Sequence, residues 1–137
     1  MMGLYIASPM RLLTILLLLL PAAMAAQSSP PAQPLPAGVT ADMIAKGKEL
    51  FQGAGLCMAC HGMDGKGSVG PDLSDTLWLH HKGSYEEITA QVIKGIPEDQ
   101  SKSGAVMPPR GGSALSDAEI RAVAAYVWSL SRRASSP

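Results

Sequence analysis

Large aromatic side chains are scarce in this chain. Among its 137 residues, aromatic residues make up only 4%, with a single Phe and two Trp. Aromatic side chains supply much of the apolar area that small cores bury, and a chain of this length has room for one modest domain. The sequence therefore provides little large apolar surface, and we expect something other than aromatic side chains to fill the interior.

An excess of charge of either sign is also absent. Lys and Arg total 11, Asp and Glu total 11, and no basic run or patterned basic face occurs. Domains that bind nucleic acid usually present clustered Lys and Arg. We therefore expect no nucleic acid among the partners of this protein.

A long uninterrupted apolar run is missing as well. The most apolar stretch, residues 12–26, contains Pro21 and is shorter than the roughly 20 apolar residues that a membrane-spanning helix needs. Arg11, the apolar run and the small residues after it match a secretory signal peptide over residues 1–26, with Ala23-Met24-Ala25 as the cleavage motif. We predict export to the periplasm, with membrane attachment only if this segment stays uncleaved.

The next segment, residues 27–38, holds four prolines among Ser, Ala and Gln. Such a composition favours an extended, unpacked chain. We interpret it as a linker, which leaves residues 39–133 for the folded domain.

Helical periodicity begins directly after this linker. Thr40 is suited to be an N-cap, Gly53 and Gly55 end the run, and the residues between them that recur at helical spacing are Ile44, Gly47, Leu50 and Phe51. We predict a first helix from this pattern.

Two further helices are predicted from capping boxes, in which Ser precedes Glu by three positions. One pair is Ser84 and Glu87, and that helix ends at Gly95; the other is Ser116 and Glu119, and that helix runs to about Leu130. No segment alternates with period two, so the sequence predicts an all-α domain. A short helical turn is possible around residues 73–78.

The most specific functional motif is the run Cys57-Met58-Ala59-Cys60-His61, which is the C-x-x-C-H pattern of covalent haem attachment. Two thiols at this spacing can each add to one vinyl group of a haem, and the adjacent imidazole can bind the iron. Zinc binding and dithiol exchange are alternatives. Both are disfavoured, because His61 lies too close to Cys60 for easy tetrahedral geometry and a βαβ context is missing.

A second iron ligand is needed on the other face of a haem. Met107 is the first choice, because thioether sulfur suits a haem carrier and two prolines follow it in the sequence. His80 and His81 are the competing ligands for a bis-His haem. Their polar surroundings favour a solvated turn for both.

Together these motifs resemble those of class I cytochromes c. The resemblance rests on Cys57 to His61, on Gly70-Pro71-Asp72-Leu73, on Met107-Pro108-Pro109 and on the helix from Ser116 to Leu130, in the family's order. It implies three main helices and short turns around one covalent haem c.

The same resemblance implies roles for individual residues. Gly47 and Phe51 on the first helix would pack against Tyr126 on the last, and the Pro71 carbonyl would orient His61. Trp78 is either a core aromatic or a donor to a haem propionate, and the latter is favoured.

The segments around residues 75–78 and 125–130 are most similar to haem domains of cbb-type oxidase subunits and of periplasmic dehydrogenase electron acceptors. A single C-x-x-C-H and no convincing membrane span favour a separate, monomeric carrier. It would pass electrons from a dehydrogenase or other respiratory donor to an oxidase or reductase, without being an enzyme itself. A cytochrome subunit permanently bound to such a complex is the first alternative. A peroxidase or gas sensor with an open sixth iron position, near Arg110, is another.

Overall fold

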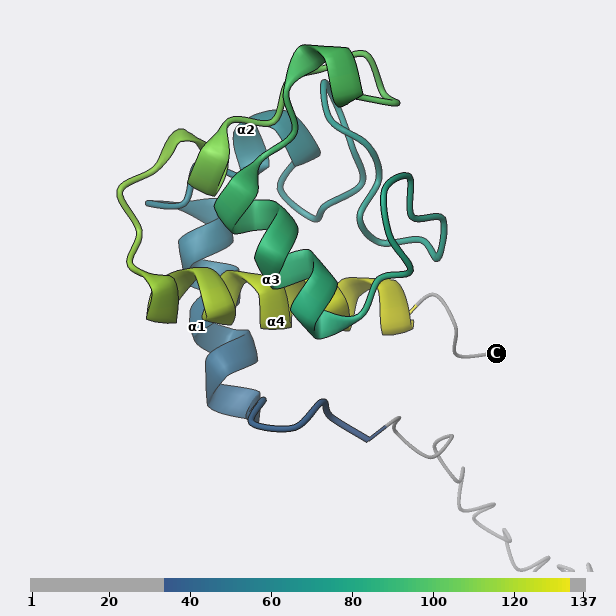
Figure 1. Cartoon of the computed structure of the whole chain (residues 1–137). Helices are drawn as coiled ribbons and strands as arrows, with labels where there is room; N and C mark the ends of the chain where they lie inside the picture. The colour runs from purple at the N-terminus through teal and green to yellow at the C-terminus, as the bar shows by residue number, and fades with distance from the viewer. Residues whose placement is uncertain (1–33, 134–137) are drawn as a thin grey trace, which may run out of the picture.

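The computed structural model describes residues 34–133, which fold into four α-helices and two short 3-10 helices (Figure 1). The elements in chain order are α1 (Ala41–Gln52), α2 (Met58–His61), α3 (Tyr85–Lys94), η1 (Glu98–Gln100), η2 (Pro109–Gly112) and α4 (Asp117–Arg133). The described residues contain no strand, only an isolated bridge between Ile96 and Met107. The predicted all-α class is therefore confirmed.

The predicted signal peptide, residues 1–26, lies outside the described residues, as does most of the predicted linker. No helix within residues 34–133 has both the length and the apolarity to cross a bilayer.

Helix α1 begins and ends at the predicted residues. The Thr40 side chain accepts a hydrogen bond from the Met43 N–H at 3.2 Å, which satisfies one of the free donors of the first turn. At the other end, the Gly53 N–H donates to the Leu50 carbonyl.

The capping box of α3 is formed in both directions. The Glu87 N–H donates to the Ser84 hydroxyl at 3.2 Å, and the Ser84 N–H donates to the Glu87 carboxylate at 3.0 Å. Gly95 ends the helix with φ +71°.

Helix α4 begins at the second capping box and is longer than expected. The Ser116 N–H donates to the Glu119 carboxylate at 2.8 Å. The helix continues past Leu130 to Arg133. Its last turn has a packing role, because the Arg132 guanidinium lies over the Trp128 ring and donates to the Gly83 carbonyl.

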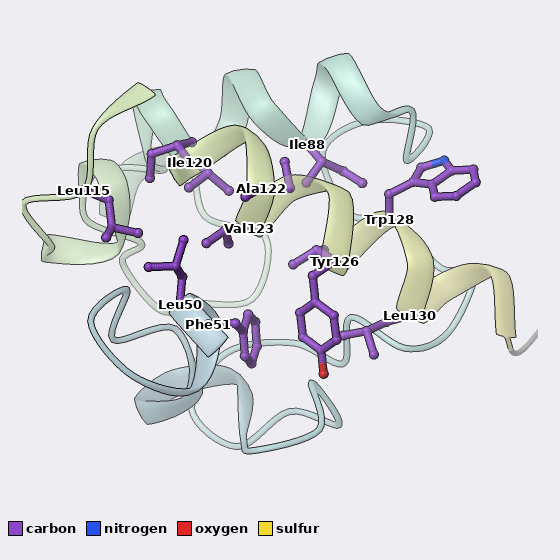
Figure 2. Close-up of a cluster of buried hydrophobic side chains, with 13 residues drawn as sticks. Leu50, Phe51, Ile88, Leu115, Ile120, Ala122, Val123, Tyr126, Trp128 and Leu130 are labelled. Atoms are coloured by element: carbon purple, nitrogen blue, oxygen red, sulfur yellow. The ribbon is translucent and has the colours of Figure 1, made fainter. Parts of the chain in front are cut away.

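The core forms where α1 crosses α4. A Cβ at Gly47 would lie 1.9 Å from the Ala122 carbonyl oxygen, so only glycine permits this approach. Beside the crossing, the rings of Phe51 and Tyr126 meet edge to face with centroids 5.3 Å apart (Figure 2). This contact between the first and last helices is the one that the resemblance implied.

The short helical turn expected around residues 73–78 does not form. Residues 73–76 are bends instead, because two Asp side chains capture backbone N–H groups that a helix would use. Asp72 accepts from the Ser74 N–H at 2.6 Å and Asp75 accepts from the Leu77 N–H at 2.9 Å. The expectation of a helical turn was wrong, and the short helices lie elsewhere, at α2, η1 and η2.

Candidate haem site

The C-x-x-C-H run folds into a single helical turn. The Cys57 carbonyl accepts hydrogen bonds from the N–H groups of Cys60 at 3.2 Å and His61 at 3.0 Å. This turn, α2, stands beside the loops on one side of α4 (Figure 1). Both cysteine side chains are half-buried and line one large cavity, which His61 lines as well.

That cavity has a volume of about 1090 Å³ including its open mouth. Its walls come from all four α-helices, from η2 and from the loops between them. Most of the side chains that line it are apolar, and those from the helices include Ile88, Val92, Val123 and Val127. Apolar walls with a few placed polar groups are typical of sites that hold sizeable ligands. The lining of this cavity fits a haem.

His61 is held as a metal ligand would be held. It is only 9% exposed, and its Nδ1 lies 2.9 Å from the Pro71 carbonyl oxygen. Because a carbonyl can only accept, Nδ1 must carry the proton, and Nε2 keeps its lone pair for a metal. Burial lowers the pKa of His61, and the Pro71 bond opposes this only partly. The imidazole is therefore neutral at neutral pH.

Gly70 makes room for this ring. A Cβ at this position would lie 2.8 Å from Cε1 of His61. The Gly70 N–H also donates to the Cys60 carbonyl at 2.8 Å, which fastens the loop to the attachment turn. Glycine therefore brings the loop close enough for the Pro71 carbonyl to reach the imidazole.

The environment of Cys57 differs from that of a reactive dithiol. Burial raises the pKa of Cys57 to about 11. Exchange-active and metal-bound cysteines need the thiolate, which low pKa values favour. This thiol stays protonated at neutral pH, which speaks against the dithiol alternative. Zinc is disfavoured on other grounds, because residues 34–133 contain no group of three or more His, Cys, Asp or Glu side chains that could hold a metal ion.

Met107 lines the same cavity as His61 and is anchored through its backbone. The Ile96 N–H donates to the Met107 carbonyl at 2.7 Å, and the Met107 N–H donates to the Ile96 carbonyl at 3.0 Å. Gly95 lies against the same segment, since a Cβ there would lie 2.4 Å from the Met107 carbonyl oxygen. The end of α3 thus fixes the position of the methionine loop.

Trp78 is half-buried, lines the cavity and packs against the core cluster. Its indole lies against Gly83, where a Cβ would come within 2.1 Å of Nε1. The indole ring also stacks on the imidazole ring of His81, with ring centroids 4.8 Å apart and an angle of 30° between the planes. Trp78 therefore both packs against the core and lines the cavity, and its hydrogen bond to a haem propionate stays a prediction.

The two histidines that follow Trp78 in the sequence both line the cavity, and the His81 side chain is only 9% exposed. For His81 the prediction of a solvated turn was wrong, because its ring forms a hydrogen bond inside the loop. His81 Nδ1 accepts a bond from the Gly83 N–H at 2.9 Å, which folds the ring inward.

The side chain of Arg110, the candidate distal group of a peroxidase or sensor, makes its contacts outside the cavity. Its guanidinium donates to the Leu115 carbonyl at 2.7 Å and pairs with Asp117 at the start of α4. Arg110 is not among the residues that line the cavity. This arrangement gives no support to a distal role.

Several loop residues at the cavity were not predicted from the sequence. Apolar side chains that line it and are also largely exposed belong to Leu56, Val69, Leu77 and Val106. They lie outside the regular helices, so helical periodicity gave no indication of them. They mark the part of the cavity wall that reaches the surface.

Comparisons with known proteins agree with this geometry. A family model described as cytochrome c oxidase, cbb3-type, subunit III matches residues 42–127. The cbb3-type oxidase subunit CcoP of Rhodobacter capsulatus is 40% identical over 93 residues, which cover 61% of this chain and 28% of that protein. The subunit FixP of Bradyrhizobium diazoefficiens is 39% identical over 89 residues, 63% of this chain and 27% of that protein.

The CcoP subunit of Rubrivivax gelatinosus is 36% identical over 89 residues, 64% of this chain and 26% of that protein. The match thus spans less than a third of each of these relatives. No solved structure matches the chain significantly.

Proposed function

Because the chain belongs to the family of cbb3-type cytochrome c oxidase subunit III and carries one covalent haem c, we propose that it is a cytochrome component of a respiratory oxidase. In this role it passes single electrons toward the catalytic subunits of the complex. The observation that carries the proposal is that the relatives reported above are oxidase subunits rather than free carriers.

In the proposed site Cys57 and Cys60 form the two thioether bonds to the haem, and His61 and Met107 are the iron ligands. Bound haem supplies a one-electron carrier, and methionine with histidine ligation raises its reduction potential. The protein's part is to hold these ligands still. The Pro71 carbonyl orients the imidazole, and the bridge to Ile96 fixes the methionine loop.

Electrons would enter and leave where the cavity wall is exposed. The side chains of Leu77 and Val69 are 75% and 67% exposed while lining the cavity. Exposed apolar side chains at the rim suit brief contact between electron-transfer proteins, whose interfaces are small. No substrate needs to reach the iron in this mechanism.

A freely diffusing periplasmic carrier is the second candidate, and it was the first choice from the sequence. The predicted signal peptide over residues 1–26 favours it. In that case the donor would be a periplasmic dehydrogenase or another respiratory protein, and the acceptor an oxidase or reductase.

Purification of the full chain with a C-terminal tag, from a host that attaches haem, separates these candidates. For an oxidase component, we expect the tag to recover haem-copper oxidase activity from mildly solubilised membranes. Recovery of all the tagged protein as a small species from the periplasmic fraction would instead support the free carrier. A purified mature chain whose mass lacks one haem would refute both.

A further inference from the structure

His81 holds a hydrogen-bond donor that the described residues leave without a partner. The Gly83 N–H donates to Nδ1 of His81 at 2.9 Å, so the neutral ring must carry its proton on Nε2. Nε2 is buried and finds no acceptor among residues 34–133. Because an unsatisfied buried N–H costs free energy, such groups usually have an acceptor.

The charged and titratable neighbours of His81 do not supply this acceptor. The Glu87 carboxylate of α3 lies 4.0 Å from Nδ1, which is not the nitrogen that carries the proton. This carboxylate already accepts hydrogen bonds from the N–H groups of Ser84 and Lys82. Arg132 of α4, which binds the Gly83 carbonyl, is itself a donor. His80 precedes it in the same loop and contributes only an unfavourable charge interaction when protonated.

The position of the ring suggests which group accepts the hydrogen bond from Nε2–H. His81 lines the haem cavity and stacks on Trp78, which lines it too. A haem carries two carboxylates, and a carboxylate is the strongest acceptor that the cavity would hold. The remainder of the nearby wall consists largely of apolar side chains, including Leu77, Ile88 and Val92.

We propose that His81 is a haem-binding residue whose Nε2–H donates a hydrogen bond to a haem propionate, beside Trp78. This inference rests on the proposed function only in requiring the covalent haem. The bond holds the propionate ionised, because a donor favours the charged form of a carboxylate. The ring itself stays neutral, since protonating Nδ1 would break the bond from Gly83.

Burial also lowers the pKa of His81, which agrees with a neutral donor. The consequence is a reduction potential that changes little with pH near neutrality. Without the donor, the propionate pKa would rise by about one unit, a tenfold change in proton affinity. An ionised propionate stabilises ferric iron, so the potential of such a variant would fall as pH rises through that pKa.

The test compares His81→Phe with His81→Gln in the haem-loaded protein. Phenylalanine keeps a ring to stack on Trp78 but has no N–H, whereas glutamine keeps an N–H donor. We expect voltammetry across pH to show the new pH-dependent fall in potential for His81→Phe and a profile close to wild type for His81→Gln.

A second measurement uses the wild-type protein alone. In ¹⁵N NMR spectra of the reduced protein we expect one slowly exchanging ring N–H from His81, bonded at Nε2. A wild-type potential profile for His81→Phe, or the same change for His81→Gln, would overturn the inference, as would a rapidly exchanging His81 ring proton. Failure of the proposed function would look different: a free carrier would give the same His81 results while the tag recovered no oxidase activity, and a wild-type protein without covalent haem would refute both.

Discussion

Replacing Gly95 with alanine tests whether the end of α3 positions the methionine loop. Gly95 has φ +71°, which costs an L-residue about 1–2 kcal/mol. The added Cβ would also lie 2.4 Å from the Met107 carbonyl oxygen and 2.7 Å from the Pro109 nitrogen. Both are backbone atoms, so the loop must retreat by about 1 Å to reach ordinary contact.

Such a shift strains the bridge between Ile96 and Met107, whose two hydrogen bonds are each worth about 1 kcal/mol. Overpacking of this kind adds about 1–3 kcal/mol to the backbone strain. We therefore expect Gly95→Ala to lower the free energy of unfolding by about 2–5 kcal/mol. The ferric iron–sulfur absorption band should weaken, because the thioether moves with its loop.

Gly104 provides a matched control three residues before Met107. It has φ +79°, but a Cβ there would have no atom within 4 Å. Gly104→Ala should therefore cost only the strain of about 1–2 kcal/mol and leave the absorption band intact. Denaturant unfolding and visible spectra of the two variants measure the difference. Equal stability losses together with an unchanged band in Gly95→Ala would refute the argument that α3 positions the ligand.

Three other predictions concern the ligand, the helix crossing and a surface ion pair. Met107→Ala should abolish the ferric iron–sulfur band and lower the reduction potential, and an unchanged spectrum would remove Met107 from the site. Gly47→Val should destabilise the fold by about 3 kcal/mol or more in denaturant unfolding, because its Cβ would lie 1.9 Å from the Ala122 carbonyl oxygen; wild-type stability would contradict the close approach. The hydrogen bond and charge of Arg110 lower the pKa of Asp117, so the pair stabilises the fold above the unfolded pKa of about 3.9 and this contribution is lost as pH falls through the folded pKa. Asp117→Asn should flatten that acid dependence of stability, and an unaltered profile would mean that the pair contributes nothing.

Local sequence patterns predict the chemistry of the haem site but not the positions of the groups that surround its ligands. Cys57, Cys60 and His61 lie within five consecutive positions, so their spacing alone indicates haem attachment. The partner of the imidazole is ten residues away, and its proximity depends on Gly70 approaching the ring. Spacing carries no information about that approach.

The helices and the haem chemistry follow from the sequence alone. Capping boxes, such as that of Ser84 and Glu87, and apolar periodicity are local properties, so they predict where α1, α3 and α4 begin. Which loop residues face the cavity depends instead on the folded chain. His81 is polar and lies among polar neighbours in the sequence, yet it is buried against Trp78. Burial of a loop residue depends on contacts between distant segments, which no local pattern records.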